Sequence, residues 1–143
     1  MKLKIYLDEN ATMPTRAHET DAGLDLYAER GAVVYGNSAE TFDTGVHIEI
    51  PAGYAGFLKS KSGLNVKFDI TSEGVIDAGY TGSTTVKLYN NGKYPFYVNK
   101  GDKITQLVIL PIETPELELV EDLEQFNKSE RGDNGFGSTG RQA

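Results

Sequence analysis

The stretch STTVKLYN at residues 83–90 decides the fold class, because its apolar side chains alternate with polar ones. A period of two is that of a β-strand, whose successive side chains point to opposite faces. The same period occurs on both sides of this stretch, in LKIYL (3–7), VHIEI (46–50), YAGFLK (54–59), FYVN (96–99), ITQLVILPI (104–112) and LELVE (117–121). We therefore expect an all-β protein.

Short turn-forming segments separate these strands, at residues 51–53, 90–93 and 100–102. Many short strands at even spacing are typical of a sandwich, a jelly roll or a barrel. Only residues 63–68 suit a short helix, and no repeat of fixed period indicates a propeller or a solenoid.

The composition narrows the class of protein. A chain of 143 residues fits one domain, and 14 Lys plus Arg against 21 Asp plus Glu give a net charge of −7. This charge disfavours non-specific binding of nucleic acid. The absence of cysteine excludes disulfides and zinc-thiolate sites. MKLKIYLDEN lacks the apolar run of a signal peptide, and no stretch is long enough to cross a membrane, so we expect a cytoplasmic protein.

The composition changes after Phe126. Residues 127–143 are rich in glycine, serine and charge, which divides the chain into a β domain (1–126) and a flexible C-terminal tail (127–143). An inert disordered tail is one interpretation. A functional one rests on a cation, a glycine, two hydroxyls and an aromatic ring, namely Arg131, Gly137, Ser138, Thr139 and Phe136. Such groups can wrap a polyphosphate and stack on a base.

The tail sequence ERGDNGFGSTG (130–140) resembles the fifth signature of the trimeric dUTPase family, in a phage or bacterial form. Four further signatures occur in order, DAGLDLYA (21–28), KSGL (61–64), GVIDAGYTG (74–82) and GDKITQL (101–107). The resemblance implies a jelly-roll-like distorted β-barrel that forms a homotrimer with shared active sites. It also implies Mg²⁺-assisted hydrolysis of dUTP to dUMP and pyrophosphate, which limits uracil in DNA and supplies dUMP for dTMP synthesis.

In the third motif, the resemblance makes Asp77 the base that activates water. Without the other motifs, an Ile-Asp-Ala-Gly segment is most often a turn in which the Asp caps local amides. The resemblance further implies that backbone groups of this motif bind uracil and that Tyr80 packs under the deoxyribose and excludes a 2′-hydroxyl. The residues expected to contact the nucleoside are Thr71, Gly74, Val75, Ile76, Asp77, Tyr80 and Thr85.

The remaining motifs supply the phosphate contacts and the support for the metal. The expected phosphate-binding and charge-stabilising residues are Lys61, Ser62, Gly63, Gln106 and Arg131. Lys61 stands where the family usually has arginine, which grips phosphate with two hydrogen bonds where lysine is a point charge. Asp25 is expected to support Mg²⁺ through water, although it reads equally as a partner of buried backbone.

Two further departures, Gly79 and Thr81, lie in the third motif, and we expect them to affect subunit contacts or loop stiffness. Three rival functions come from other classes. A dCTP deaminase would release ammonia, a non-catalytic dUTP sensor would not need Asp77, and a structural barrel would need none of the five motifs.

Overall fold

The stretch at 83–90 forms strand β8 (Ser83–Asn90), in which every second residue from Thr84 to Asn90 is buried. The computed structural model describes residues 1–142. The other elements are β1 (Lys4–Leu7), β2 (Gly23–Tyr27), β3 (Ala32–Val34), β4 (Ser38–Glu49), β5 (Tyr54–Lys59), α1 (Ser62–Phe68), β6 (Ile70–Thr71), β7 (Glu73–Ile76), β9 (Phe96–Val98), β10 (Lys103–Pro111) and the 3₁₀ turn η1 (Leu123–Gln125).

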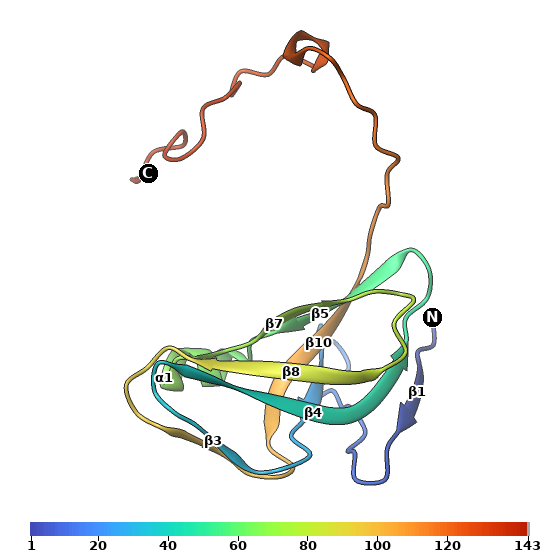
Figure 1. The fold of residues 1–143 in the computed structure, drawn as a ribbon, viewed down its shortest axis with the longest axis vertical. Coiled ribbons are helices and arrows are strands. Elements are labelled where there is room, and N and C mark those ends of the chain that lie inside the picture. The colour runs from blue at the N-terminus through green and yellow to red at the C-terminus, as the bar shows by residue number, and fades with distance from the viewer. Residues whose placement is uncertain (143) are drawn as a thin grey trace. The chain divides into compact units, whose positions relative to one another are not determined.

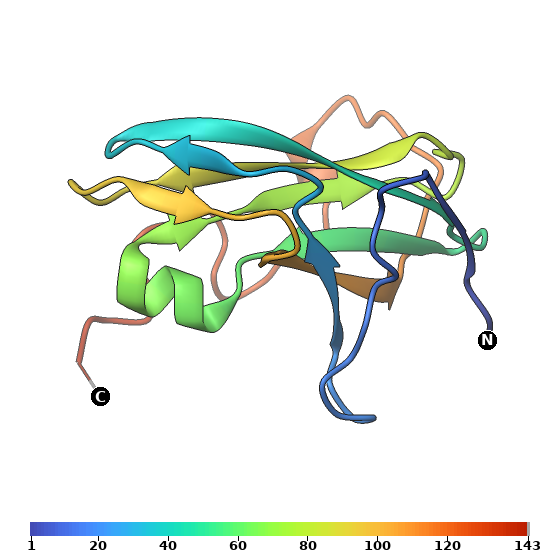
Figure 2. The same ribbon diagram turned by 90° about the horizontal axis from the view of Figure 1, so that it is seen from below.

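Two four-stranded antiparallel sheets face each other. One has the order β1-β4-β8-β6 and the other β2-β10-β5-β7, while β3 and β9 form a separate pair. Figures 1 and 2 show β4 and β8 in one layer and β5 and β10 in the other. The all-β prediction is therefore confirmed, and closure into a barrel and assembly into a trimer stay predictions.

The hydrophobic core lies between these two sheets. It contains Phe42 and Val46 of β4, Val86 and Leu88 of β8, and Leu107 of β10, all of them fully buried. Each such side chain stabilises the fold by about 1.5–3 kcal/mol through the apolar surface that it removes from water. The core fixes the relative positions of the sheets and of the loops that leave them.

Several sequence predictions are confirmed in detail. The short helix lies at Ser62–Phe68, and it ends at Asp69, whose φ of 57° is left-handed. The turns predicted at 51–53 and 100–102 contain Gly53 and Gly101, with φ of 84° and 87°. Glycine adopts this conformation without the steric cost that a side chain brings.

The strand predicted at 117–121 is wrong. Residues 112–120 form no strand, and the side chains of Leu117 and Leu119 are both 96 % exposed. The alternation is real, but a strand needs a neighbour for its backbone hydrogen bonds. No described strand of the same chain, within residues 1–142, pairs with this segment.

The predicted strand at 46–50 is too short, because β4 begins at Ser38. Its middle contains a β-bulge, where the pairing with β8 shifts between Asp43 and His47 and Gly45 has a φ of 64°. A glycine beside a polar pair resembles a turn in the sequence, which hid the first half of the strand.

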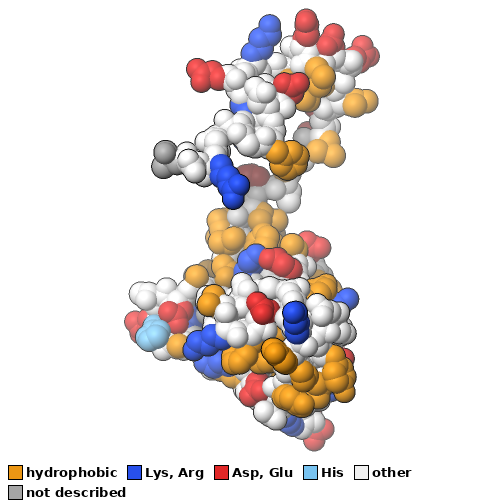
Figure 3. Space-filling view, turned by 90° about the vertical axis from the view of Figure 1, so that its left-hand side faces the viewer, with side chains coloured by type: hydrophobic (Ala, Val, Ile, Leu, Met, Phe, Trp, Pro, Cys, Tyr) orange, Lys and Arg blue, Asp and Glu red, His pale blue; other side chains and the backbone are white. Residues whose placement is uncertain are grey.

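Residues 1–113 form one compact unit and the residues from Thr114 on form a second. The division of function between a domain ending at Phe126 and a tail stays a prediction. On the face in Figure 3, acidic and basic side chains are interspersed. Within residues 1–142, no helix has the length and apolar character that crossing a membrane requires.

Candidate active site

The loop at residues 77–82 joins β7 to β8 and borders a hollow of about 430 Å³. Most of the residues predicted to contact the nucleoside line it, namely Gly74, Val75, Ile76, Asp77, Tyr80 and Thr85. Strand β7 is at the edge of its sheet, so the backbone groups on its outer side are free to pair with a ligand. Thr71 does not line the hollow, because it lies on β6, where its hydroxyl accepts a hydrogen bond from Asn91.

Asp77 lies directly after β7 and is exposed. Its carbonyl oxygen accepts a hydrogen bond from the amide of Tyr80 at 3.0 Å, which closes the turn. Within the described residues 1–142, no hydrogen bond reaches its carboxylate. The turn is thus held by the backbone, and the carboxylate is free to bind a water molecule.

The ring of Tyr80 is fixed by two contacts within the loop. Its hydroxyl donates to the carbonyl oxygen of Ser83 at 2.9 Å. The ring also covers Gly82, where an added Cβ would lie 2.9 Å from the ring atom Cε2 and closer still to its hydroxyl end. Gly82 is therefore a site residue that the sequence alone did not single out, although it ends the third motif.

Asp25 forms a second site on β2, and its side chain is 8 % exposed. The Lys61 ammonium donates to Oδ1, and Lys103 Nζ lies 2.8 Å from Oδ2. Burial by itself would raise the pKa of Asp25, but the hydrogen bonds from Lys103 and Lys61 outweigh it and lower the pKa. We call these three residues the Asp25 cluster. At neutral pH it holds two cations around one carboxylate.

Lys103 was missed by sequence reasoning, although it lies in the fourth motif. Asp25 in turn raises the pKa of the Lys103 ammonium by a hydrogen bond. Gln106 is adjacent to the cluster, opposite Asp25 in the β2–β10 pairing, and its Nε2 donates to the carbonyl oxygen of Ser60 at 3.0 Å. Gly23 leaves the space that the Gln106 side chain fills. Lys61 and Gln106 therefore both lie beside Asp25, and their contact with phosphate stays a prediction.

The Asp25 cluster and the loop at 77–82 lie at opposite ends of strand β5. Asp77 follows Ile76, which pairs with Gly56, whereas Gln106 pairs with Lys59. Three residues along a strand correspond to roughly 10 Å. Within one chain, the predicted base is therefore offset along the sheet from the predicted phosphate-binding residues. Ser62 and Gly63, at the start of α1, lie exposed beyond the same end of β5 as the cluster.

Both sites fall within residues 9–140, which match the protein family described as dUTPase. The chain belongs to the dUTPase family. It is 40 % identical over 144 residues to the deoxyuridine 5'-triphosphate nucleotidohydrolase of Clostridium acetobutylicum. This similarity covers 98 % of the chain and 97 % of that protein.

Solved dUTPase structures share the fold. The dUTPase of Staphylococcus bacteriophage 80alpha with dUPNHPP has a TM-score of 0.90 and 36 % identity, over 98 % of this chain and 99 % of its own. A mutant dUTPase from phage phi11 of S. aureus, whose structure concerns the coordination of a structural Mg(II) ion, has a TM-score of 0.80 and 36 % identity. It covers 87 % of this dUTPase and 99 % of its own chain.

The fifth motif of this dUTPase lies in the unit from Thr114 on and has local structure of its own. The Arg131 guanidinium donates through Nε to the carbonyl oxygen of Asn134 at 2.9 Å. Together with Phe136, Gly137, Ser138 and Thr139 it lines a hollow of about 610 Å³. Phe136 is fully exposed. The motif thus offers a cation, hydroxyls and a free aromatic ring.

Residues 1–142 of this dUTPase contain no group of three His, Cys, Asp or Glu side chains that could hold a metal ion. Both oxygens of Asp25 already face ammonium groups. A cage made of protein ligands alone therefore does not fit. Mg²⁺ keeps several waters and commonly binds substrate phosphates, so it fits this site as the companion of a triphosphate. The contact of Asp25 with a metal-bound water stays a prediction.

Proposed function

We propose that this dUTPase converts dUTP to dUMP and pyrophosphate by direct attack of water on the α-phosphate. The observation that carries the proposal is the exposed carboxylate of Asp77, free of hydrogen bonds from residues 1–142, on the rim of a hollow of suitable size. A carboxylate in this position can hold a water and accept its proton. No covalent intermediate is needed, because water is the nucleophile.

Uracil is read by the outer edge of β7. The backbone N–H and C=O groups of Gly74 to Ile76 can pair with the 4-oxygen and N3–H of uracil, and cytosine presents the opposite pattern there. A close fit of uracil against this edge would exclude the methyl group of thymine. Tyr80, held over Gly82, packs under the deoxyribose and excludes a 2′-hydroxyl.

The triphosphate, with its Mg²⁺, binds the lysines of the Asp25 cluster. Lys61 and Lys103 present two ammonium groups, and Gln106 adds an amide donor. Ser62 and Gly63 at the start of α1 add a hydroxyl and a backbone amide. Preorganised donors of this kind stabilise charge that develops as pyrophosphate leaves.

We further propose that the active site is shared within a homotrimer. Support comes from the separation of Asp77 from the Asp25 cluster along β5, which a second copy of the chain would overcome by bringing its own cluster to the first copy's loop. The exposed leucines of the unpaired segment 117–121 also favour burial against another copy. The tail then closes over the substrate, with Arg131 on the phosphates and Phe136 on the base.

Light scattering tests the assembly and is expected to give the mass of three chains. A fully active monomer would contradict the shared site. The substrate is tested by incubating the full chain with Mg²⁺ and each canonical nucleoside triphosphate in turn, with pyrophosphate release as the readout. Rapid turnover is expected for dUTP alone.

The base is tested by Asp77→Asn, which keeps the shape of the side chain and removes its basicity. Turnover is expected to fall by roughly 10²- to 10⁴-fold, the range for loss of a general base. The trimer and the affinity for a non-hydrolysable dUTP analogue are expected to persist. Activity within a few-fold of the parent protein would make Asp77 a structural turn residue.

A further inference from the structure

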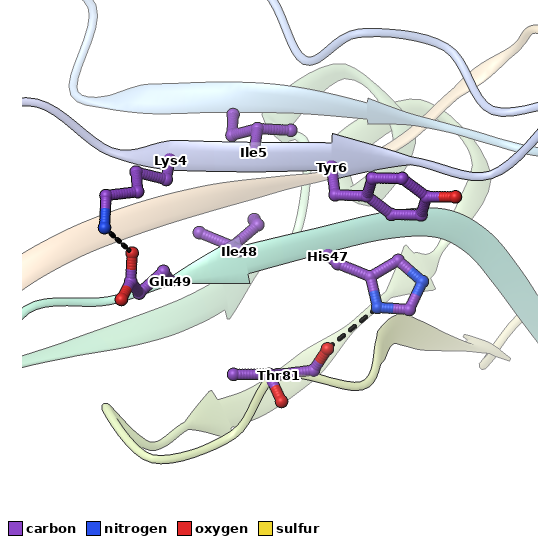
Figure 4. A pocket seen from close by; sticks show the side chains of 7 residues that line it. All are labelled: Lys4, Ile5, Tyr6, His47, Ile48, Glu49 and Thr81. Atoms are coloured by element: carbon purple, nitrogen blue, oxygen red, sulfur yellow. Dashed lines mark hydrogen bonds and ion pairs between the residues drawn. The ribbon is translucent and has the colours of Figure 1, made fainter.

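His47 of β4 hydrogen-bonds in two directions, and Figure 4 shows the one toward Thr81. Its Nδ1 lies 2.8 Å from the carbonyl oxygen of Thr81, and its Nε2 lies 3.3 Å from each carboxylate oxygen of Asp8. Tyr6 of β1 packs edge-on against the imidazole, with ring centroids 5.5 Å apart. The imidazole therefore joins the end of β1 and strand β4 to the loop at residues 77–82.

The bulge in β4 brings the ring to this position. The bulged residues end at His47, which pairs directly with Ser83, the first residue of β8. Gly45 makes the bulge possible with its φ of 64°. On the other side of the bulge, Asp43 accepts a hydrogen bond from the Ser83 hydroxyl. Both His47 and Asp43 thus hold the point where the loop enters β8.

The protonation of His47 decides whether both of its contacts can form. The carbonyl oxygen of Thr81 and the carboxylate of Asp8 can only accept hydrogen bonds. A neutral imidazole carries one N–H and satisfies one of them, whereas the imidazolium donates to both. The hydrogen bond to the Thr81 carbonyl raises the pKa of His47 above its usual value, and the hydrogen bond to Asp8 is the second largest cause of the increase.

The charged groups around the ring favour the imidazolium. Asp8 at the end of β1 and Asp43 on β4 are acidic, and both act to raise the pKa of His47. Glu29, which follows β2, approaches the bulge of β4 from another side. Lys4 and Glu49 further along the same face form an ion pair with each other at 2.7 Å (Figure 4).

We propose that His47 is a positioning residue, which as an imidazolium ties the loop at 77–82 to β1 and β4 and thereby sets the positions of Asp77 and Tyr80. The inference rests on the proposed function of that loop. Loss of one proton removes one of the two hydrogen bonds, and the loop that binds the nucleoside becomes less ordered. Substrate binding is then coupled to the charge of a histidine that does not line the hollow at this loop.

The sign of the pH dependence follows from the direction of the shift. The ordinary pKa of histidine is about 6.5, and that of His47 is raised. The stabilisation is therefore fully present below about pH 6.5 and is lost as the pH rises through the higher pKa of the folded protein. Affinity for a uracil nucleotide is expected to fall over the same interval.

The test measures the dissociation constant of the non-hydrolysable analogue dUpNHpp with Mg²⁺ between about pH 6 and pH 9 on the full chain. Proton NMR follows the histidines in parallel, and since the chain has only two, His18→Gln assigns them. Binding is expected to weaken roughly three- to tenfold as His47 titrates, the effect of losing one hydrogen bond of ordinary net strength. The nucleotide's own ionisation cancels when variants are compared at equal pH.

Three variants separate positioning from simple structural damage. His47→Gln keeps an amide donor for the Thr81 carbonyl but cannot titrate, so the transition is expected to disappear while good binding remains. Asp8→Asn lowers the pKa of His47 and is expected to move the transition to lower pH. His18→Gln is the matched control and is expected to keep the parent profile.

An unchanged pH profile in His47→Gln would overturn the proposal, as would a transition that does not coincide with the NMR titration of His47. Failure of the proposed function would look different. If Asp77 were not the base, Asp77→Asn would keep its turnover, while the amide signals of Thr81 and Gly82 would still move with the titration of His47.

Discussion

Replacing Asp25 with asparagine tests whether one buried carboxylate organises the two cations that we propose to bind phosphate. The amide keeps the shape of the side chain but loses its charge. Its NH₂ group also faces one of the two ammonium groups, and an ammonium cannot accept a hydrogen bond. One of the two charge-assisted hydrogen bonds is lost, and the other is weakened because a neutral amide oxygen replaces a carboxylate oxygen. The side chains of Lys61 and Lys103 are 27 % and 43 % exposed, so water replaces part of this loss. We expect the free energy of unfolding to fall by about 2–4 kcal/mol.

The assay is urea unfolding at a fixed chain concentration, because stability and assembly are coupled in an oligomer. Far-UV circular dichroism and tyrosine fluorescence are suitable signals, since the chain has 8 tyrosines and no tryptophan. Glu49→Gln is the matched control. It breaks the ion pair between Glu49 and Lys4, whose side chains are 55 % and 82 % exposed, respectively. No resolvable change in the free energy of unfolding is expected. Equal midpoints for Asp25→Asn and the parent protein would refute the organising role of Asp25.

The difference in stability between Asp25→Asn and the parent protein is also expected to depend on pH. The pKa of Asp25 is lowered in the folded chain, so its stabilisation is present above the ordinary value of about 3.9 and is lost as the pH falls through the lower folded value. The two stabilities are therefore expected to converge in strong acid. A stability difference that stayed constant on acidification would show that the charge of Asp25 is not its cause.

Two further changes test the loop and the tail. Gly82→Ala adds a Cβ that displaces the ring of Tyr80. We expect a roughly tenfold loss of affinity for dUTP and weaker discrimination against UTP, while the free energy of unfolding hardly changes. Unaltered selectivity between dUTP and UTP would show that the ring does not recognise the sugar. A chain ending at Phe126 loses no described strand, so its unliganded stability is expected to persist while turnover nearly vanishes. Full activity of the truncated chain would make the tail an inert linker. Phe136→Ala is expected to lose about 1–3 kcal/mol of binding free energy if the ring stacks on uracil.

The Asp25 cluster gives a physical reason for the lysine at position 61 in the second motif. A guanidinium can take both oxygens of a carboxylate in a bidentate pair, whereas an ammonium takes one. Lys61 occupies Oδ1 of Asp25 and leaves Oδ2 to Lys103. The departure from arginine thus permits two cations to share one carboxylate.

The sequence by itself determined the short helix, the turns and the strands β1, β5, β8, β9 and β10, with part of β4. It did not predict the strands β2, β3, β6 and β7. The alternation at 83–90 predicts β8 because the side-chain period of a strand is a local property of the backbone. The five motifs identified the family for a similar reason, since chemistry-bearing residues such as Asp77 are recognisable from their immediate neighbours in the chain. The turn at Gly101 likewise needed only local geometry.

Only the tertiary structure decided which residues meet. Lys103 is 78 positions from Asp25 along the chain, and β2–β10 pairing brings them together. Separation of the Asp25 cluster from Asp77 depends on the register of β5 with its two neighbours. The same dependence explains the wrong strand at 117–121, whose alternation is correct but which has no partner among the described strands of its own chain. The alternation determines the face of the sheet on which a side chain lies. The pairing with a distant strand determines which residues that side chain contacts.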